Sequence, residues 1–328
     1  NRTLSPSEIY QLYANYHAPD TLITVERDGQ VSLHWNYDNN IQPNKYYIYR
    51  GIAGASIEKY DSIIAYSSVD TTYTFYYYQL SSVDTLGNES QLTDTIRAIP
   101  CEIISDYDGN EYRTIKIGEQ YWMRDNVATT HYSDGSTLIN GAGAGTITDY
   151  SAQYYFAYNN DENNVATYGR LYTWAAIMKG ESLVDNPDYV QGICSDEWHI
   201  PSDSEWKQLE IELGMSQAEA DAMDWRGTNE GSLIAGRSDL WNDDVLEMDP
   251  DFGNSGFFAL PTGFRYSSGS FSYLNSATLF WSKSHYNTTS VWTRRLDNSL
   301  KQIRRDDESK IHAFPIRCIK NTNPIINS

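Results

Sequence analysis

The chain has 328 residues, of which 40% are hydrophobic and 21% are charged, so it is long enough for two globular domains and too apolar for disorder. Its 24 basic and 44 acidic residues give a net charge of −20, which argues against nucleic acid as a partner because phosphate binding needs clustered cations. No run of 18 apolar residues occurs, so no membrane-spanning segment is predicted. Three cysteines without a Cys-x-x-Cys pair and six scattered histidines fit neither a disulfide scaffold nor a zinc site.

Aromatic residues are over-represented, with 27 tyrosines and 9 tryptophans. Such residues beside short polar side chains are typical of extracellular β-rich proteins and of binding surfaces, although they also fill the cores of β-sheets. The basic pairs Arg294-Arg295 and Arg304-Arg305 stand near acidic residues at strand-like spacing, and we interpret them as solvated strand faces.

Residues 1–17 are predicted to form a short N-terminal helix. Ser5 is a capping residue, Pro6 suits the first helical position, and Glu8 completes a capping box.

The periodicity of apolar residues changes to two from Thr21 onward, which indicates β-strands. A strand, a turn at Asp28-Gly29 and a second strand ending at Trp35 come first, and "KYYIYRG" follows them. Short strands separated by regularly spaced turns favour a β-sandwich.

Residues 18–98 resemble a fibronectin type III module, through Trp35, "YYIYRG" and "YYYQLSSVDTLGNES". The resemblance implies an all-β sandwich in a domain spanning 18–100, with Tyr76 or Tyr78 on the tyrosine-corner strand. Such modules act as spacers or adhesive units, so this fold alone does not define a function.

The pattern changes at "RAIPCEII", and a second domain is predicted over 103–320, followed by a tail over 321–328. The ordered motifs "YGRLYTWAAI", "WHIPSDSEW", "DWRGTNEG", "GFFALPTGFR", "LFWSKSHYN" and "FPIRCIK" resemble the Fibrobacter succinogenes major paralogous domain, which occurs on surface proteins of Bacteroidetes and their relatives. Two positions depart from the family pattern: Cys194 is followed by Ser195-Asp196 rather than by proline, and Pro315 replaces a small residue.

The stretch "CSDEWHIPSDSEW" at 194–206 combines a cysteine, a histidine and acidic residues, and it predicts structure rather than catalysis. Ser202 and Glu205 form a capping box, so the acidic residues of the first turn satisfy free N–H groups and the helix dipole. Trp206 and Leu209 then share one helical face, and Ser216 with Glu219 begins a second short helix. His199 is interpreted as a packed side chain beside Trp198.

The same stretch and the final strand are similar to elements of formylglycine-generating-enzyme-like domains. This resemblance implies an α+β fold of the C-type-lectin-like class and a structural disulfide between Cys194 and Cys318, with Cys101 outside it. An inert buried thiol or a catalytic thiol is the alternative for Cys194. The oxidase activity is not carried over, because it needs a close pair of reactive cysteines that binds copper.

Two loop regions are candidates for ligand binding, since aromatic platforms beside carboxylates and amides suit sugars. The first region contributes Trp225, Asn229, Glu230, Trp241, Asp243 and Asp244, and the second contributes Trp281, His285 and Tyr286. The acidic residues of the first region are also a candidate Ca²⁺ site; no other cofactor is expected. The alternative is that these tryptophans belong to the core and that the acidic loops are merely solvated.

The leading hypothesis is a non-catalytic surface lipoprotein, on the extracellular face of the outer membrane or secreted, that binds a glycan, a peptide or a partner protein. Its contact with the membrane would run through a lipid anchor outside this sequence. One alternative is a structural accessory subunit of an outer-membrane nutrient-import complex, and another is a formylglycine-generating type of enzyme.

Overall fold

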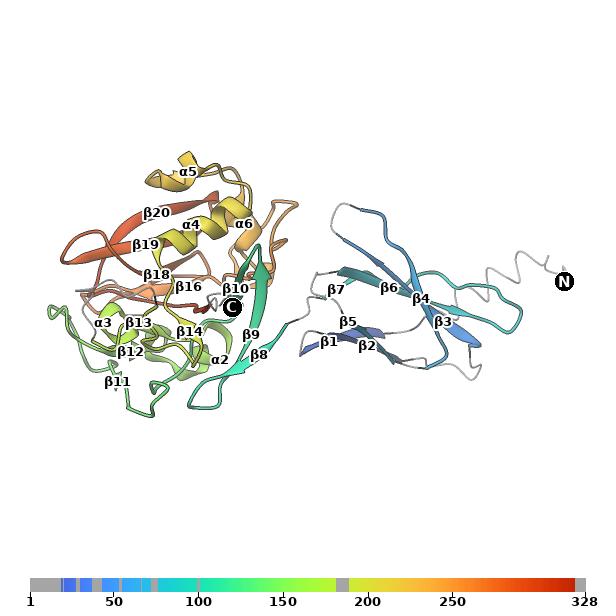
Figure 1. Ribbon diagram of the computed structural model, residues 1–328, viewed down its shortest axis with the longest axis horizontal. Coiled ribbons are helices and arrows are strands. Elements are labelled where there is room, and N and C mark those ends of the chain that lie inside the picture. The colour runs from blue at the N-terminus through green and yellow to red at the C-terminus, as the bar shows by residue number, and fades with distance from the viewer. Residues whose placement is uncertain are drawn as a thin grey trace, which may run out of the picture. The chain divides into compact units, whose positions relative to one another are not determined.

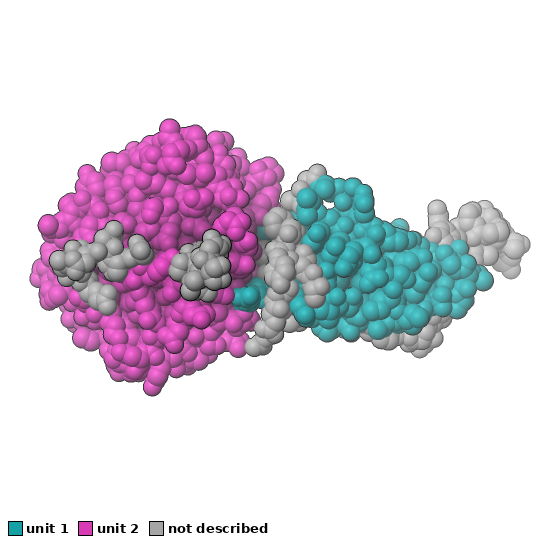
Figure 2. Space-filling view, viewed as in Figure 1, with its two compact units in different colours: residues 1–102 teal, residues 103–328 magenta. Residues whose placement is uncertain are grey.

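The computed structural model describes Pro19 and residues 21–27, 30–36, 43–52, 55–65, 67–71, 76–98, 101–180 and 189–321. The chain divides into two compact units, residues 1–102 and residues 103–328 (Figure 2). The predicted helix over 1–17 and the predicted turn at Asp28-Gly29 lie outside the described residues. None of the described helices is both long enough and apolar enough to cross a membrane.

The strands that the structure describes in the first unit form two antiparallel sheets (Figure 1). One sheet has the order β1 (Thr21–Arg27), β2 (Gln30–Asn36), β5 (Ser67–Thr71). The other has the order β4 (Glu58–Ile63), β3 (Lys45–Gly51), β6 (Tyr76–Val83), β7 (Ile96–Ala98). Alternate residues of β2 and β3 are buried, as the period of two predicts, and the shared core contains Val31, Leu33, Trp35, Tyr46, Ile48, Tyr78 and Leu80. The predicted β-sandwich is therefore confirmed.

The second unit is also mostly β-sheet, and its described residues, 103–180 and 189–321, form three sheets. The first has the order β14 (Trp198–His199), β22 (Ile319–Lys320), β10 (Gln120–Met123), β9 (Glu111–Ile117), β8 (Ile103–Ser105). The second has the order β11 (Ile139–Asn140), β12 (Tyr154–Phe156), β13 (Leu171–Thr173), β21 (Ala313–Phe314), β16 (Thr262–Arg265), β17 (Phe271–Leu274). The third, which positions the candidate site, has the order β15 (Asp224–Arg226), β20 (Leu300–Ser309), β19 (Ser290–Asp297), β18 (Ala277–His285).

The α-helices in the described part of this unit are short: α2 (Val165–Tyr168), α3 (Trp174–Ile177), α4 (Asp203–Glu212), α5 (Gln217–Asp221) and α6 (Glu230–Ile234). Helix α4 begins with the predicted capping box, in which the Ser202 hydroxyl accepts from the backbone N–H of Glu205. Trp206 is buried against Trp122 and Phe280, with ring centroids 4.8 and 5.6 Å away. The capping box of α5 is also confirmed.

A buried ion-pair network fixes α4 to the third sheet. Asp203 accepts from Arg294 at 2.9 Å and from Arg305 at 2.8 Å, and Glu210 accepts from Arg294 and Arg226 at 2.6 Å each. Burial acts to raise the pKa of Asp203, but its hydrogen bonds and the charges of both arginines outweigh burial and lower it to about 2. Asp203 therefore does more than satisfy the helix N-terminus, because it joins two strands to the helix.

This network corrects the interpretation of the two basic pairs as solvated strand faces. Successive side chains of a strand point to opposite faces of the sheet, so each pair is divided. Arg294 and Arg305 point towards α4 and are buried, whereas Arg295 and Arg304 lie on the opposite face and stay partly exposed.

A disulfide joins Cys194, which precedes the strand β14, to Cys318, which precedes β22. These are the two cysteines that the resemblance implies; their Cα atoms are 5.9 Å apart and both side chains are buried. Cys101 is buried and lies outside this disulfide. His199 is packed as expected, because it is buried and its Nε2 lies 2.7 Å from the Glu205 carboxylate.

Candidate functional site

Two residues of the first predicted region are buried and cannot contact a ligand. Trp241 is 4% exposed, and its indole N–H donates to the carbonyl oxygen of Gly236 at 3.1 Å. Glu230 is also 4% exposed, and its carboxylate accepts from the backbone N–H groups of Thr228 and Asn229 at the start of α6. The prediction that Trp241 and Glu230 bind a ligand is therefore wrong, because both serve local packing and helix capping.

The remaining polar residues of this region do not converge. The Asn229 amide donates to Asp251 at 3.1 Å, Asp243 is exposed, and the backbone N–H of Asp244 donates to the carboxylate of Glu247. Over the residues that the structure describes, no group of three Asp, Glu, His or Cys side chains is placed to hold a metal ion. The proposed Ca²⁺ site is accordingly not assembled by Asp243 and Asp244.

Trp281, from the second predicted region, is a core residue. It is fully buried on β18, where its indole N–H donates to the carbonyl oxygen of Tyr172 at 2.7 Å and its ring packs 4.3 Å from Phe314. The prediction that Trp281 binds a ligand is therefore wrong. The tryptophan of the motif "LFWS" points into the core from a strand. The sequence alone did not distinguish it from an exposed aromatic residue that could contact a ligand.

His285 and Tyr286 lie at the exposed end of the β18–β19 hairpin. The Nδ1 of His285 is 3.1 Å from Lys310 Nζ, and its ring meets Trp174 edge to face. Burial lowers the pKa of His285, and the positive charge of Lys310 acts in the same direction. Tyr286 is 46% exposed and packs on Trp292, so this end of the hairpin is accessible but presents only one exposed aromatic ring beside the histidine.

Trp225 belongs to a surface of the third sheet on which side chains from several strands lie close together. It is half-buried on β15, and Arg304 of β20 lies directly opposite it in the antiparallel ladder. Arg304 is in turn opposite Arg295 of β19, so the three side chains lie on one face of the sheet. Asp306 and Glu308 follow Arg304 at the alternate positions of β20 and share this face.

The strand β17, which lies at the edge of the second sheet, adds an exposed aromatic ring to this surface. Tyr273 is 43% exposed, its ring stacks on Phe264 with centroids 5.1 Å apart, and the Arg295 guanidinium lies 5.0 Å from its centroid. We call the surface made by Trp225, Tyr273, Arg295, Arg304, Asp306 and Glu308 the Arg–carboxylate face.

The backbone at Tyr273 is strained. Its φ is +67°, in the left-handed region that a bulky side chain rarely adopts. The conformation costs on the order of 1–3 kcal/mol and persists only where the surroundings impose it, and such positions cluster at functional sites. The strained backbone presents the ring outward, next to Arg295.

Both guanidinium groups of the face are paired with carboxylates. Arg295 Nη2 donates to Asp297 Oδ2 at 2.8 Å. Arg304 bonds to Asp306 through Nη2, and its Nε lies 3.2 Å from Asp224 Oδ1. The face therefore carries charges of both signs side by side rather than a basic or an acidic patch.

The carboxyl group of Glu308 has a displaced pKa. Burial, and then the negative charge of Asp306, raise its pKa to about 7. The other charged or titratable groups that act on it are Asp307, Arg304, Arg295, His312 and Tyr266. At neutral pH this carboxyl group is therefore partly protonated and able to donate a hydrogen bond.

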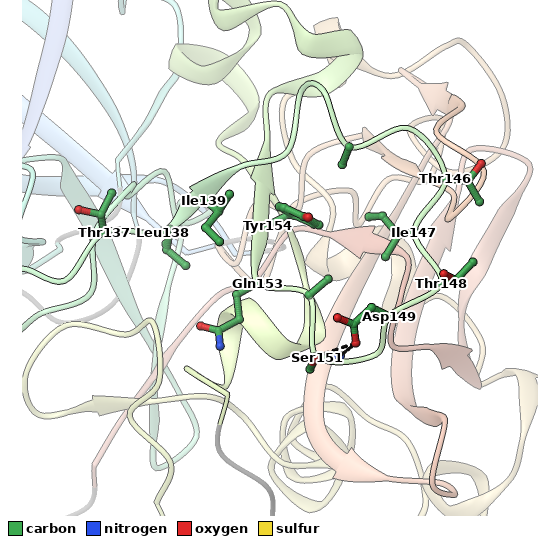
Figure 3. A pocket seen from close by; sticks show the side chains of 12 residues that line it. Thr137, Leu138, Ile139, Thr146, Ile147, Thr148, Asp149, Ser151, Gln153 and Tyr154 are labelled. Carbon is green, nitrogen blue, oxygen red and sulfur yellow. Dashed lines mark hydrogen bonds between the residues drawn. The ribbon is translucent and has the colours of Figure 1, made fainter.

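A hollow of about 450 Å³ lies apart from these residues (Figure 3). Its lining residues lie between Thr137 and Tyr154, the first residue of β12. Its wall mixes hydroxyl and amide side chains, among them Thr146, Thr148 and Gln153, with apolar side chains such as Leu138 and Ile147. Its acidic residue, Asp149, accepts from both the N–H and the hydroxyl of Ser151, and these bonds lower its pKa. Because this carboxylate is engaged in its own turn, the hollow is a weaker candidate than the Arg–carboxylate face.

Sequence reasoning found Trp225 but missed the other members of the face. The signal was present in "LKQIRRDDES", where Arg304, Asp306 and Glu308 alternate with residues that point the other way. Tyr273 carried no comparable signal, because neither its exposure nor its positive φ follows from the local sequence.

The fold and this surface define a β-rich protein of two units, the second of which presents an aromatic and ionic face. The model of the Fibrobacter succinogenes major domain matches residues 115–320, which is more than half of the chain, and the chain belongs to this family. A search of curated proteins returns no match.

Several solved structures are similar to a quarter of the chain. A β-1,2-glucanase from Parabacteroides distasonis is 22% identical with a TM-score of 0.23, over 25% of this chain and 12% of that one. An Fn3-like protein from Clostridium thermocellum is 26% identical with a TM-score of 0.21, over 25% of this chain and 95% of that one. The protein FN3tt is 20% identical with a TM-score of 0.21, over 25% and 89% of the two chains.

Proposed function

We propose that this chain is a non-catalytic surface protein that binds an external ligand, a glycan, a peptide or a partner protein, through the Arg–carboxylate face. One observation carries the proposal: Tyr273 is held outward by a strained backbone beside Arg295, on a face whose other members stay partly exposed. Strain of this kind needs compensation from the surrounding structure, and a ligand platform is a reason for keeping it.

The second unit is proposed to have the C-type-lectin-like fold, with the first unit as a fibronectin type III spacer. Two features support the lectin-like assignment. The disulfide ties the segment before α4 to the segment before the last strand, and the helices are short beside small sheets.

The protein is proposed to act outside the cytoplasm, as an outer-membrane surface lipoprotein with a lipid anchor beyond this sequence, or as a secreted protein. A buried disulfide that closes a loop across most of the second unit supports this location, because such bonds persist in oxidising compartments. The chain's net charge of −20 supports a ligand other than nucleic acid.

An oxidase of the formylglycine-generating type receives little support from the same residues. That chemistry needs two reactive, accessible thiolates, whereas Cys194 and Cys318 are bonded to each other and fully buried.

The test is a binding screen of the full chain on glycan and peptide arrays, with a Tyr273→Ala variant. We expect the wild type to bind a defined class of ligand and the variant to lose that binding. Tyr150→Ala is the matched control, because Tyr150 is equally exposed, at 43%, but lies on the loop before β12. Binding that Tyr273→Ala leaves unchanged, or no binding to any probe, would contradict the proposal.

A further inference from the structure

The Arg–carboxylate face presents hydrogen-bond donors and acceptors in alternation. A guanidinium group only donates and a carboxylate only accepts. Arg295 and Arg304 lie opposite each other on adjacent strands, and each has a carboxylate beside it, Asp297 and Asp306. A ligand that matches this pattern needs groups that both donate and accept over a short distance, which is the property of neighbouring hydroxyl groups on a sugar ring.

The pairing of each arginine with a carboxylate disfavours charged ligands of either sign. An anionic ligand would have to approach the carboxylates of Asp224, Asp306 and Glu308, on a chain that already carries a net charge of −20. A cationic ligand would meet Arg295 and Arg304. Like charges brought together at an interface are unfavourable and so reject the wrong partner. A neutral polar ligand avoids both penalties.

Tyr273 supplies the apolar part of the recognition. One side of its ring is covered by Phe264 at an interplanar angle of 16°, while 43% of the residue remains exposed. An exposed ring with a polar rim suits a ligand that is apolar on one surface and polar at its edge. A pyranose has this character, since C–H groups cover one surface of the ring and hydroxyl groups surround it.

We infer that the Arg–carboxylate face binds a neutral glycan, with one pyranose ring against Tyr273 and its hydroxyl groups bonded to Arg295, Arg304 and their paired carboxylates. The inference rests on the proposed binding function of this face and specifies its ligand. It selects neutral oligosaccharides over uronic acid, sulfated and amino sugars, and over basic peptides.

The experiment measures binding of the full chain to four probes by titration calorimetry: a neutral mixed-hexose oligosaccharide set, oligogalacturonate, chitosan oligosaccharides and a lysine-rich peptide. We expect the neutral set to contain the tightest ligand, and Tyr273→Ala to weaken its binding about tenfold. Tyr150→Ala should leave its affinity unchanged.

Arg304→Gln tests the pairing argument separately. This variant frees Asp306 and Asp224 from their cation, so it should weaken binding of the neutral ligand and strengthen binding of chitosan oligosaccharides. Circular dichroism of each variant verifies that it is folded. Preference of the wild type for oligogalacturonate, chitosan or the peptide, lost in Tyr273→Ala, would overturn the neutral-glycan inference and leave the proposed function standing. Failure of every probe and of the array ligands to bind would overturn both.

Discussion

Asp203 shows how one carboxylate can connect elements that are far apart in the sequence. It accepts from Arg294 and Arg305, and its side chain is 9% exposed. Replacing it with asparagine leaves two buried guanidinium groups without their shared anion, so we expect Asp203→Asn to destabilise the second unit by about 3–5 kcal/mol in urea denaturation. Asp221→Asn removes an exposed carboxylate paired with Lys207, and it should leave the free energy of unfolding nearly unchanged. Equal effects of the two variants would contradict this role for Asp203.

Glu308 makes stability depend on pH in the opposite direction from most carboxylates. Its pKa is raised from 4.5 to about 7, so the folded protein holds this proton more tightly than the unfolded chain does. The resulting stabilisation is complete below pH 4.5 and is lost as the pH rises through 7. Since a third of the side chain is exposed, we expect that loss to be about 1–2 kcal/mol after allowance for solvent screening.

The variant Glu308→Gln cannot lose a proton from this side chain. Relative to the wild type, it should therefore gain about 1–2 kcal/mol in unfolding free energy between pH 5 and pH 8. Urea denaturation at the two pH values measures this difference. If the unfolding free energies of the wild type and of Glu308→Gln differ by the same amount at pH 5 and at pH 8, then the carboxyl group of Glu308 titrates in its usual range.

At the scale of elements, the two capping boxes offer a matched comparison. Ser202 caps α4, a helix of ten residues that is fixed to the third sheet, whereas Ser216 caps α5, which has five mostly exposed residues. We expect Ser202→Ala to cost about 1 kcal/mol in unfolding free energy and Ser216→Ala to cost less than half of that, because α5 contributes little to the cooperative core. A larger effect at Ser216 would mean that α5 is part of that core.

The same two helices show what the sequence could predict about elements. Their starts follow from local chemistry, since Ser202 with Glu205 and Ser216 with Glu219 are three residues apart. The burial of one arginine of each basic pair could not be predicted from the local sequence, because it depends on which face of the sheet α4 covers. The burial of Trp241 and Trp281 was missed for a similar reason: an aromatic residue on a strand or loop has the same local sequence whether it faces the core or the solvent.

At the scale of the whole molecule, the period of two in residues 21–98 predicted strands and a sandwich, but it did not predict which strands pair. β1 pairs with its neighbour β2, whereas β2 also pairs with β5, and β3 pairs with β6. The sheets of the second unit join distant segments, such as β10 with β22 and β13 with β21. Pairings of this kind left little trace in local periodicity, and the family resemblance predicted more about this unit than spacing did. The Arg–carboxylate face depends on such pairings, so it emerged only from the structure.

The disulfide should stabilise one unit and not the other, since Cys194 and Cys318 both belong to residues 103–328. The two half-cystines are 124 positions apart, and removing a native disulfide costs about 2–5 kcal/mol, largely by restoring freedom to the unfolded chain. Two compact units are expected to give two unfolding transitions in calorimetry. We expect the double variant Cys194→Ser/Cys318→Ser to lower the melting temperature of the second unit by several degrees and to leave that of the first unit unchanged.

Cys101→Ser, outside the disulfide, is the control for cysteine replacement in the first unit. A double variant that shifts both transitions together would show that the two units unfold as one cooperative body, and one that shifts neither would show that the cross-link does not constrain the unfolded chain.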